Sequence, residues 1–552
     1  MVIVIFWMCG CVSAQVLWAP GGVTVCGLSG PQESPSLIAD GAGGAIIAWA
    51  DRRDMTVYDI YAQHVDADGE SLWTTGGAPV CTVSQDQYFP SITATQGGYI
   101  IAWQDVRNIS GQSDIYAQKL NSDGIPQWTS GGVAVCNNFG NQYAVAVASD
   151  NTGGAYVAWR DTRNDPLSGN TDIYLQRIGS DGLNLWANAV HISKPGVEDR
   201  DVSLTSDGAG GVILVWQDGR GALSNPSTGK DIYAQRVGPN GTLMWGADAL
   251  PICTAPGDQR FPRMIPDGAG GIIITWDDRR NGTTYGVYAQ RISASGAPYW
   301  TANGVAVCAL PDSNQVVPAI SPDGSGGAFI AWTDAREGSS SRYFDIYAQR
   351  ITENGTLAWN SLGVVVCSAP GWQGRIRSAE AAAGYVFLSW ADNRRDPTNQ
   401  TYDYDIYAQK LDASGTPQWA QDGILASNDQ TKQEMHQMVS VGSNAIIVWQ
   451  DNQVETGKDI FAQKIGSDEP DIISVQSISE GKNISDGNWI SVDDKIVSAV
   501  FESSFYMQEP DRSSGIRVYA TGVSEGDMVT VLGRLETVNG ERVLLDAVVT
   551  QP

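Results

Sequence analysis

The stretch Ala-Ile-Ile-Ala-Trp-Ala-Asp-Arg-Arg (residues 45–53), followed by Asp-Ile-Tyr-Ala-Gln (59–63), decides the fold because the chain repeats it. Both pieces are rich in β-branched and aromatic residues, which is typical of short strands. The Trp-x-Asp-x-Arg motif or a close variant recurs at Trp49, Trp103, Trp159, Trp216, Trp276, Trp332, Trp390 and Trp449. The spacings are 54 to 60 residues, and a version of Asp-Ile-Tyr-Ala-Gln follows each copy, so the sequence contains eight repeats.

Each repeat is expected to form four short strands, here called a, b, c and d. In the first repeat they are residues 35–39, 45–51, 59–65 and 73–81, separated by turns rich in Gly and Asp. Four-stranded units of roughly 40 to 60 residues are the pattern of propeller blades, and the 3.6-residue period of a helical solenoid is absent. The repeats therefore predict an all-β fold, an eight-bladed β-propeller.

The two ends of the repeat array predict how the ring closes. The chain has a lone d strand at residues 17–26, and the last repeat, near residues 435–466, has strands a, b and c without d. The N-terminal strand is therefore expected to complete the last blade. Such closure removes the unpaired edges that an open array would expose.

The N-terminus reads as a secretory signal peptide, residues 1–14, with the small-x-small sequence Val12-Ser13-Ala14 before Gln15. Attachment of a lipid at Cys11 is the alternative interpretation. No later run is long and apolar enough to span a bilayer. The propeller is expected over residues 15–467, in a secreted or cell-surface protein.

The composition limits the partners. The chain has 61 acidic and 34 basic residues, a net charge of −27. A surface this acidic repels phosphate backbones and anionic membranes, so nucleic acid is not an expected partner. A protein or a carbohydrate at the cell surface is expected instead.

Residues 468–552 follow a different pattern of alternating apolar and polar residues, with a hairpin signal at Asn539-Gly540. Five to six strands in about eighty residues predict a small β-barrel. Its segments 497–500, 505–508, 515–519 and 526–533 resemble bacterial OB-fold domains found beside secreted nucleases and surface proteins. OB folds often bind nucleic acid or sugars, but fifteen acidic against six basic residues favour an accessory or docking role here.

The two faces of the predicted ring differ in sequence. The a–b and c–d turns are short and nearly uniform, whereas the d–a and b–c loops vary in length and content. The most variable b–c loops are residues 109–113, 164–171, 221–230, 337–344 and 395–404. Variable loops on a rigid scaffold are where binding usually resides, so any ligand is expected on the b–c/d–a face.

A glutamine recurs just before strand a, 16 or 17 residues ahead of each tryptophan, with Asp199 in the fourth repeat. One interpretation is an amide bonded to the backbone of a neighbouring blade. The other is a polar ring that binds a ligand over the central channel. With nearby side chains, the predicted ligand-binding residues are Gln87, Tyr88, Gln142, Tyr143, Gln259, Arg260, Gln315, Trp372, Gln373 and Gln433.

Aromatic residues are scattered over the same loops, where they could contact a glycan or a protein or pack beneath the loops. They are Tyr88, Phe89, Tyr143, Phe261, Tyr285, Tyr343, Trp372 and Tyr404.

The most conspicuous residues of the repeat are interpreted as structural. Asp and Arg two positions apart, such as Asp51 and Arg53, share one face of a strand, and nearly every repeat has the pair, whereas catalysis needs one special constellation. The cysteines occur singly, one per repeat, too far apart for disulfides and without zinc-site spacing, so they are expected to be buried and reduced. They are Cys26, Cys81, Cys136, Cys253, Cys308 and Cys367.

The three histidines form no triad or metal set, and no catalytic residue, metal ligand or cofactor is assigned. The repeats resemble secreted bacterial and archaeal surface propellers over residues 17–466, a resemblance that implies fold far more than activity. The expected function is a non-catalytic extracellular binding or scaffold protein. A structural surface-layer component is one alternative. The other is a glycan-active enzyme of sialidase-like or lyase-like type, which needs converging carboxylates or a Tyr nucleophile. Its weak candidates are Asp199, Asp201, Asp258 and Glu434.

Overall fold

The computed structural model divides the chain into two compact units, Met1–Gly466 and Ser467–Pro552. The described residues are 15–108, 111–167, 169–221, 229–337, 343–381, 384–396, 403–427, 431–453, 457–466, 472–475, 477–482, 489–501, 503–538 and 541–550. The signal-peptide prediction and Cys11 lie outside these ranges. Within them, none of the helices has the length and apolar character needed to cross a membrane.

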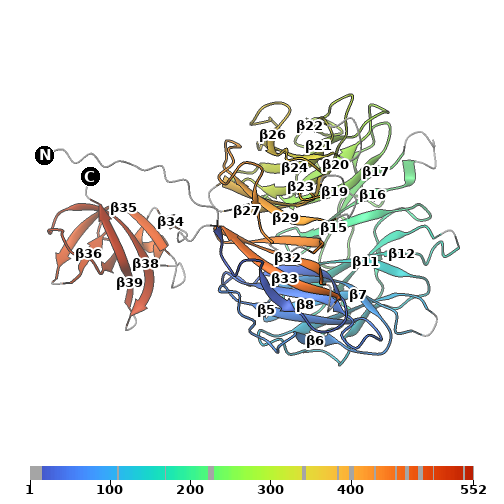
Figure 1. Cartoon of the computed structure of the whole chain (residues 1–552), viewed down its shortest axis with the longest axis horizontal. Helices are drawn as coiled ribbons and strands as arrows, with labels where there is room; N and C mark the ends of the chain where they lie inside the picture. Colours follow the sequence, from blue (N-terminus) through green and yellow to red (C-terminus); the bar gives the residue numbers. More distant parts are fainter. Residues whose placement is uncertain are drawn as a thin grey trace. The chain divides into compact units, whose positions relative to one another are not determined.

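The first unit consists of antiparallel sheets that follow one another in chain order (Figure 1). The first sheet is β3 (Gln32–Ala39), β4 (Ala45–Asp51), β5 (Asp59–Val65) and β6 (Ala78–Cys81), paired in that order. The next three sheets are β7 (Gln87–Thr95), β8 (Gly98–Asp105), β9 (Asp114–Leu120), β10 (Val133–Cys136); β11 (Gln142–Ser149), β12 (Ala155–Asp161), β13 (Asp172–Ile178), β14 (Val190–His191); β15 (Arg200–Ser206), β16 (Val212–Asp218), β17 (Asp231–Val237), β18 (Leu250–Cys253).

Three further sheets keep the same order. They are β19 (Gln259–Pro266), β20 (Ile272–Asp278), β21 (Gly286–Ile292), β22 (Val305–Cys308); β23 (Gln315–Pro322), β24 (Ala328–Asp334), β25 (Asp345–Ile351), β26 (Val364–Cys367); β27 (Gln373–Ala381), β28 (Tyr385–Asp392), β29 (Asp405–Leu411), β30 (Ile424–Leu425). The described residues thus confirm the all-β prediction and its propeller-like blades, because the remaining strands of this unit make up an eighth sheet.

The eighth sheet joins the two ends of the unit. It contains β31 (Gln433–Val441), β32 (Asn444–Gln453) and β33 (Gly457–Gly466), and its outer position is filled by β1 (Gln15–Val16) and β2 (Val23–Cys26). Both N-terminal segments pair antiparallel with β33. The Gln463 amide clamps the junction, because its Oε1 accepts from Trp18 N (3.1 Å) and its Nε2 donates to the Ala19 carbonyl (2.8 Å). The N-terminal segment therefore completes the last blade, as predicted.

The first strands of the sheets are the inner strands of the ring. Each of β3, β7, β11, β15, β19, β23, β27 and β31 contacts the next, and β31 contacts β3 again. The apolar core lies between neighbouring sheets. One cluster packs Ala48 and Ile60 of the first blade against Ile101 and Trp103 of the second. The motif tryptophan is fully buried in every blade, so each blade buries its apolar surface only against its neighbours.

The Trp, Asp and Arg side chains of the repeated motif form a hydrogen-bond network, called the motif network below. In the first blade, Trp49 Nε1 donates to Asp51 Oδ2 (2.8 Å), and Arg53 donates to both oxygens of the same carboxylate (3.0 and 2.6 Å). The Arg53 guanidinium lies 3.5 Å from the Tyr61 ring centre and donates to the Gly76 carbonyl (2.7 Å). The arginine thus ties strands b, c and d together, which supports the structural interpretation of the Asp–Arg pair.

The cysteines lie beside the motif network and belong to the preceding blade. Cys26 Sγ lies 3.9 Å from Arg53 Nη2, and burial raises the pKa of the thiol to about 12. All six cysteines in the described residues are free and buried, which confirms their prediction.

The second unit is built around one mixed sheet. Its elements are β34 (Ile472–Val475), α2 (Ile478–Gly481), β35 (Trp489–Val500), β36 (Phe505–Gln508), β37 (Gly515–Val518), β38 (Met528–Val538) and β39 (Glu541–Thr550). The sheet order is β34-β35-β36-β37-β39-β38, and β35 also pairs with β38. Phe505, Met507 and Leu544 are fully buried in its core. The OB-fold assignment stays a prediction, and Asn539-Gly540 lies outside the described residues.

Removing residues 15–26 is expected to lower the melting temperature of the ring by about 10 °C or more, because β33 becomes an exposed edge. Differential scanning calorimetry measures the change. The matched control removes residues 467–552 from the other end, which form a separate unit. Equal melting temperatures of the N-terminally shortened and full-length rings would contradict closure by this segment.

Asp231→Asn is expected to raise the melting temperature at pH 8 by about 2 °C and to leave it unchanged at pH 4. Burial, with Asp218 nearby, raises the pKa of Asp231 to about 7 from 3.8. The folded chain therefore gains stability from binding this proton. That contribution to the free energy of unfolding is complete below pH 3.8 and is lost as the pH rises through 7. The exposed Asp68→Asn serves as control, and a larger gain for D231N at pH 4 than at pH 8 would reverse the assigned sign.

Candidate functional site

All eight inner strands begin at the same end of the ring, where the d–a loops arrive and strands b give way to the b–c loops. This end is called the loop face below. Parts of its predicted variable loops, residues 109–110, 168, 222–228, 338–342 and 397–402, lie outside the described residues. The side chains at the start of the inner strands define what the rest of the face presents.

The predicted glutamines are placed in the interior. Gln87, Gln142, Gln259, Gln315, Gln373 and Gln433 are all 0% exposed. The amide of Gln142 donates to the carbonyls of Gly140 (2.9 Å) and Asn138 (3.1 Å), both in its own d–a loop. Five of the six donate to their own loop in this way, and Gln373 points to Asp392. Buried amides that donate to loop carbonyls support the structural interpretation of these glutamines, and the backbone they hold is the loop that joins the preceding blade to their own.

The fourth blade has Asp199 at the glutamine position, also 0% exposed. Burial and the charge of Asp218 raise the pKa of this carboxyl well above its usual range. A protonated carboxyl offers one donor and one acceptor, as a primary amide does, so Asp199 takes the place of glutamine chemically as well as in sequence.

Two residues after each of these eight positions the backbone adopts the left-handed conformation, which was not predicted from the sequence. Its φ lies between 51° and 56° in all eight blades, within a β-bulge of the inner strand. These residues are Ser34, Phe89, Ala144, Asp201, Phe261, Val317, Arg375 and Met435. None is glycine, although this backbone favours glycine. Proline follows four of these residues, but it favours an extended conformation with negative φ in the residue before it, so no local sequence signal predicts this backbone.

Aromatic rings and cations gather beside the left-handed residues. In the second blade the Tyr88 ring lies 5.3 Å from Tyr58 and 6.0 Å from Phe89, and Arg52 lies 5.6 Å from Tyr58. Phe89 is 53% exposed. This group, Arg52, Tyr58, Tyr88 and Phe89, is called the Phe89 cluster.

Three similar clusters occupy other blades. Arg160 lies 4.9 Å from the Tyr143 ring. Arg260 lies 3.6 Å from Tyr285 and 5.1 Å from Phe261. The Trp372 and Tyr404 rings are 5.1 Å apart, with Arg375 and Lys432 within 6 Å of Tyr404. The predicted residues Tyr88, Tyr143, Arg260 and Trp372 thus each belong to an aromatic–cation cluster on the loop face.

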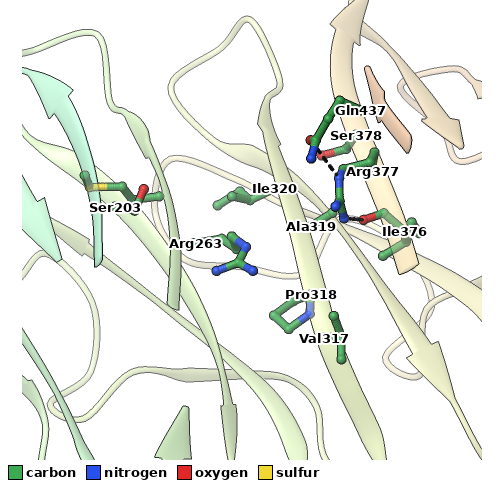
Figure 2. Close-up of a pocket in the computed structure, with 11 residues that line it drawn as sticks. Ser203, Arg263, Val317, Pro318, Ala319, Ile320, Ile376, Arg377, Ser378 and Gln437 are labelled. Carbon is green, nitrogen blue, oxygen red and sulfur yellow. Dashed lines mark hydrogen bonds between the residues drawn. The ribbon is translucent and has the colours of Figure 1, made fainter. Parts of the chain in front are cut away.

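A cavity of about 350 Å³ lies among the inner strands β15, β19, β23, β27 and β31 (Figure 2). Arg263 and Arg377 enter it from strands on either side of the segment 317–320. Arg377 donates to Gln437 Oε1 (3.1 Å) and to the Ile376 carbonyl (3.0 Å). No carboxylate is among the residues that line the cavity.

The electrostatics around the cavity are cationic. Burial, together with the charges of Arg263 and Arg375, lowers the pKa of Arg377 to about 10. Burial and the Arg377 charge lower the pKa of the neighbouring His436 to about 3, so this imidazole is neutral at pH 7. Asp277, whose pKa burial raises to about 7, is fully buried and occupied by Arg260 and by the Val317 amide.

The weak acid candidates lie in different surroundings. Asp199 is buried, Asp201 is a left-handed residue of the fourth blade, and Asp258 accepts from the Lys230 amide (3.1 Å). Glu434 forms an ion pair with Lys432 (2.6 Å), which lowers its pKa. Among the described residues no group of three His, Cys, Asp or Glu side chains is arranged to hold a metal ion.

No family model matches the chain, and no curated protein matches it. Solved structures that are similar include a polysaccharide lyase (10% identity, 73% of this chain and 93% of that one, TM-score 0.43). An ulvan lyase covers 82% of this chain and 96% of its own at 10% identity and TM-score 0.42. An endo-arabinase from Bacteroides thetaiotaomicron covers 49% and 96% at 12% identity and TM-score 0.28. At such values these structures say nothing about the activity of this chain.

Gln142→Ala is expected to lower the free energy of unfolding by about 1 to 3 kcal/mol, because the buried Gly140 carbonyl and the partly buried Asn138 carbonyl lose their donor. Denaturant titration measures the change. The control is Gln127→Ala, which removes an exposed glutamine with one bond to Ile125. A structural role is contradicted if the two variants lose the same stability.

Proposed function

We propose that this chain is a non-catalytic extracellular propeller that binds carbohydrate on its loop face. The four aromatic–cation clusters support the proposal. The apolar face of an aromatic ring packs against the C–H groups of a sugar, and arginine or lysine donates hydrogen bonds to its hydroxyl or carboxylate oxygens. The clusters combine both kinds of group at four places on one face.

One observation carries the proposal: Phe89 combines a left-handed backbone (φ 51°) with a ring that is 53% exposed. A non-glycine residue in this conformation costs free energy, and an exposed ring returns little of it through burial. Met435 repeats the combination, with φ 53° and 45% exposure. An apolar side chain that is exposed on a strained backbone indicates a surface that contacts a ligand, because a residue needed only for packing would be buried.

The non-catalytic part of the proposal is supported by the state of the carboxyl groups. Glycoside hydrolysis uses two carboxyl groups that flank one bond, separated by roughly 5 to 10 Å. Of the candidates on the loop face, Asp199 is buried, Asp258 accepts from the Lys230 amide, and Glu434 is held as an ion pair by Lys432. Secretion, the kinship with surface propellers and a docking role for the OB-like second unit belong to the same proposal.

Phe89→Ala combined with Tyr88→Ala is expected to weaken binding on a glycan array and in calorimetric titration by about tenfold or more. The single variant Phe89→Ala is expected to keep its melting temperature within about 2 °C of wild type, because Phe89 is exposed whereas Tyr88 packs against Tyr58. The matched control is Tyr299→Ala, an exposed ring near the c–d turn at the other end of the ring.

Three results would overturn this proposal. They are the absence of glycan binding by the mature chain, equal losses in the Phe89 and Tyr299 variants, and turnover of any bound glycan. Turnover is followed as new reducing ends for hydrolysis and as unsaturated uronate absorbance for elimination.

A further inference from the structure

We propose that the central channel contains an oxyanion site, in which Arg263 and Arg377 bind the carboxylate or sulfate group of a small acidic ligand. The site lies among the inner strands, not in the aromatic–cation clusters, and the proposal stands independently of carbohydrate binding on the loop face. Five consecutive blades contribute lining residues, so the site exists only in the assembled ring.

Neither Arg263 nor Arg377 forms an ion pair among the described residues. In the repeated motif, arginines pair with a buried aspartate at 2.7 Å or less, as Arg53 and Arg280 do. Among the described residues Arg263 forms no ion pair, and its one hydrogen bond goes to the Pro262 carbonyl (2.9 Å). Arg377 bonds only to neutral oxygens. Arg377 is half-buried and bonds only to neutral partners, and Arg263, which is exposed, lines the same cavity, so the two side chains favour an anionic ligand there.

The cavity also contains an unsatisfied hydroxyl. Ser378 Oγ is buried and has no hydrogen-bond partner in the described structure, and Ser378 lines the cavity next to Arg377. A buried polar atom without a partner needs a water molecule or a ligand to satisfy it.

The donors are held in place before any ligand arrives. The bonds of Arg377 to Gln437 and Ile376 use two of its five N–H groups and fix the guanidinium plane. The remaining N–H groups match the paired oxygens of a carboxylate or sulfate. The neighbouring lining residues Pro318, Ala319 and Ile320 carry no charge, so no carboxylate of the lining competes with a ligand for the two arginines.

The size of the cavity limits the ligand. Its volume of about 350 Å³ is near the lower end of ligand pockets, which span about 300 to 1,000 Å³. This space suits an inorganic oxyanion or one acidic monosaccharide unit.

The test uses the full mature chain in chloride buffer with sodium sulfate and sodium glucuronate as probes, and glucose as the neutral comparison. The variants are R263Q, R377Q and the double R263Q/R377Q. The control is R200Q, which removes the same charge from inner strand β15 at a residue outside the cavity lining. Calorimetric titration gives the affinity, and selenate soaked into crystals locates the anion by its anomalous signal.

Wild type and R200Q are expected to bind equally, and the double variant about tenfold or more weaker. Selenate is expected between the guanidinium groups of Arg263 and Arg377. Without ligand, R377Q is expected to melt no lower than wild type, because the repulsion between the two arginines is removed. Sulfate is expected to raise the melting temperature of wild type but not of the double variant.

An equal loss in R200Q, selenate found elsewhere, or unchanged affinity in the double variant would overturn the site. Binding of glucuronate without sulfate assigns the site to acidic sugars, and binding of both assigns it to oxyanions in general. Loss of glycan binding in the Phe89 variant with intact sulfate binding separates the loop-face proposal from this one.

Discussion

The ring depends on a buried carboxylate, in the repeated motif, whose two oxygens both accept hydrogen bonds. In each of seven blades the motif aspartate accepts from the tryptophan indole and from the arginine two residues on, as Asp51 does from Trp49 and Arg53. A buried charge is tolerated when it is paired and hydrogen-bonded, and then it fixes geometry. The eighth blade has Gln453 in place of the arginine, and its Trp449–Asp451 bond is longer, at 3.3 Å. The blade without the motif arginine is the one closed by the N-terminal segment.

The motif network lies between the strands, which are alike in every blade, and the b–c and d–a loops, which differ from blade to blade. Because it fixes the ends of strands b and c, the inner strand can adopt the same left-handed bulge eight times with eight different side-chain environments. The glutamine amides hold the approaching loops from beneath, as Gln142 holds Gly140. The scaffold therefore supplies the free energy that keeps residues such as Phe89 strained and exposed.

The eight repeats, the four strands of each and the N-terminal closure were all predictable from the sequence, because spacing and alternation are properties of the chain itself. The burial of the glutamines was not, since a polar residue before a strand reads equally well as exposed. Arg263 and Arg377 each follow a repeat glutamine by four positions, where other blades have Ser, Ala or Gln. Their meeting follows from the curvature of the ring, which brings the fifth and seventh repeats to one cavity, and no local pattern signals it.

The composition of the eighth sheet has a consequence for how the molecule is made. Its outer strand position is filled by residues 15–26 and its other three strands by residues 433–466, so the first and last segments of the unit must meet. No fragment that ends earlier can form a closed ring, and a growing chain carries open sheet edges until its last blade is complete. Pairing across more than 400 residues makes closure the slowest kind of contact to form, so the edges of the first and last sheets stay unpaired longest during folding.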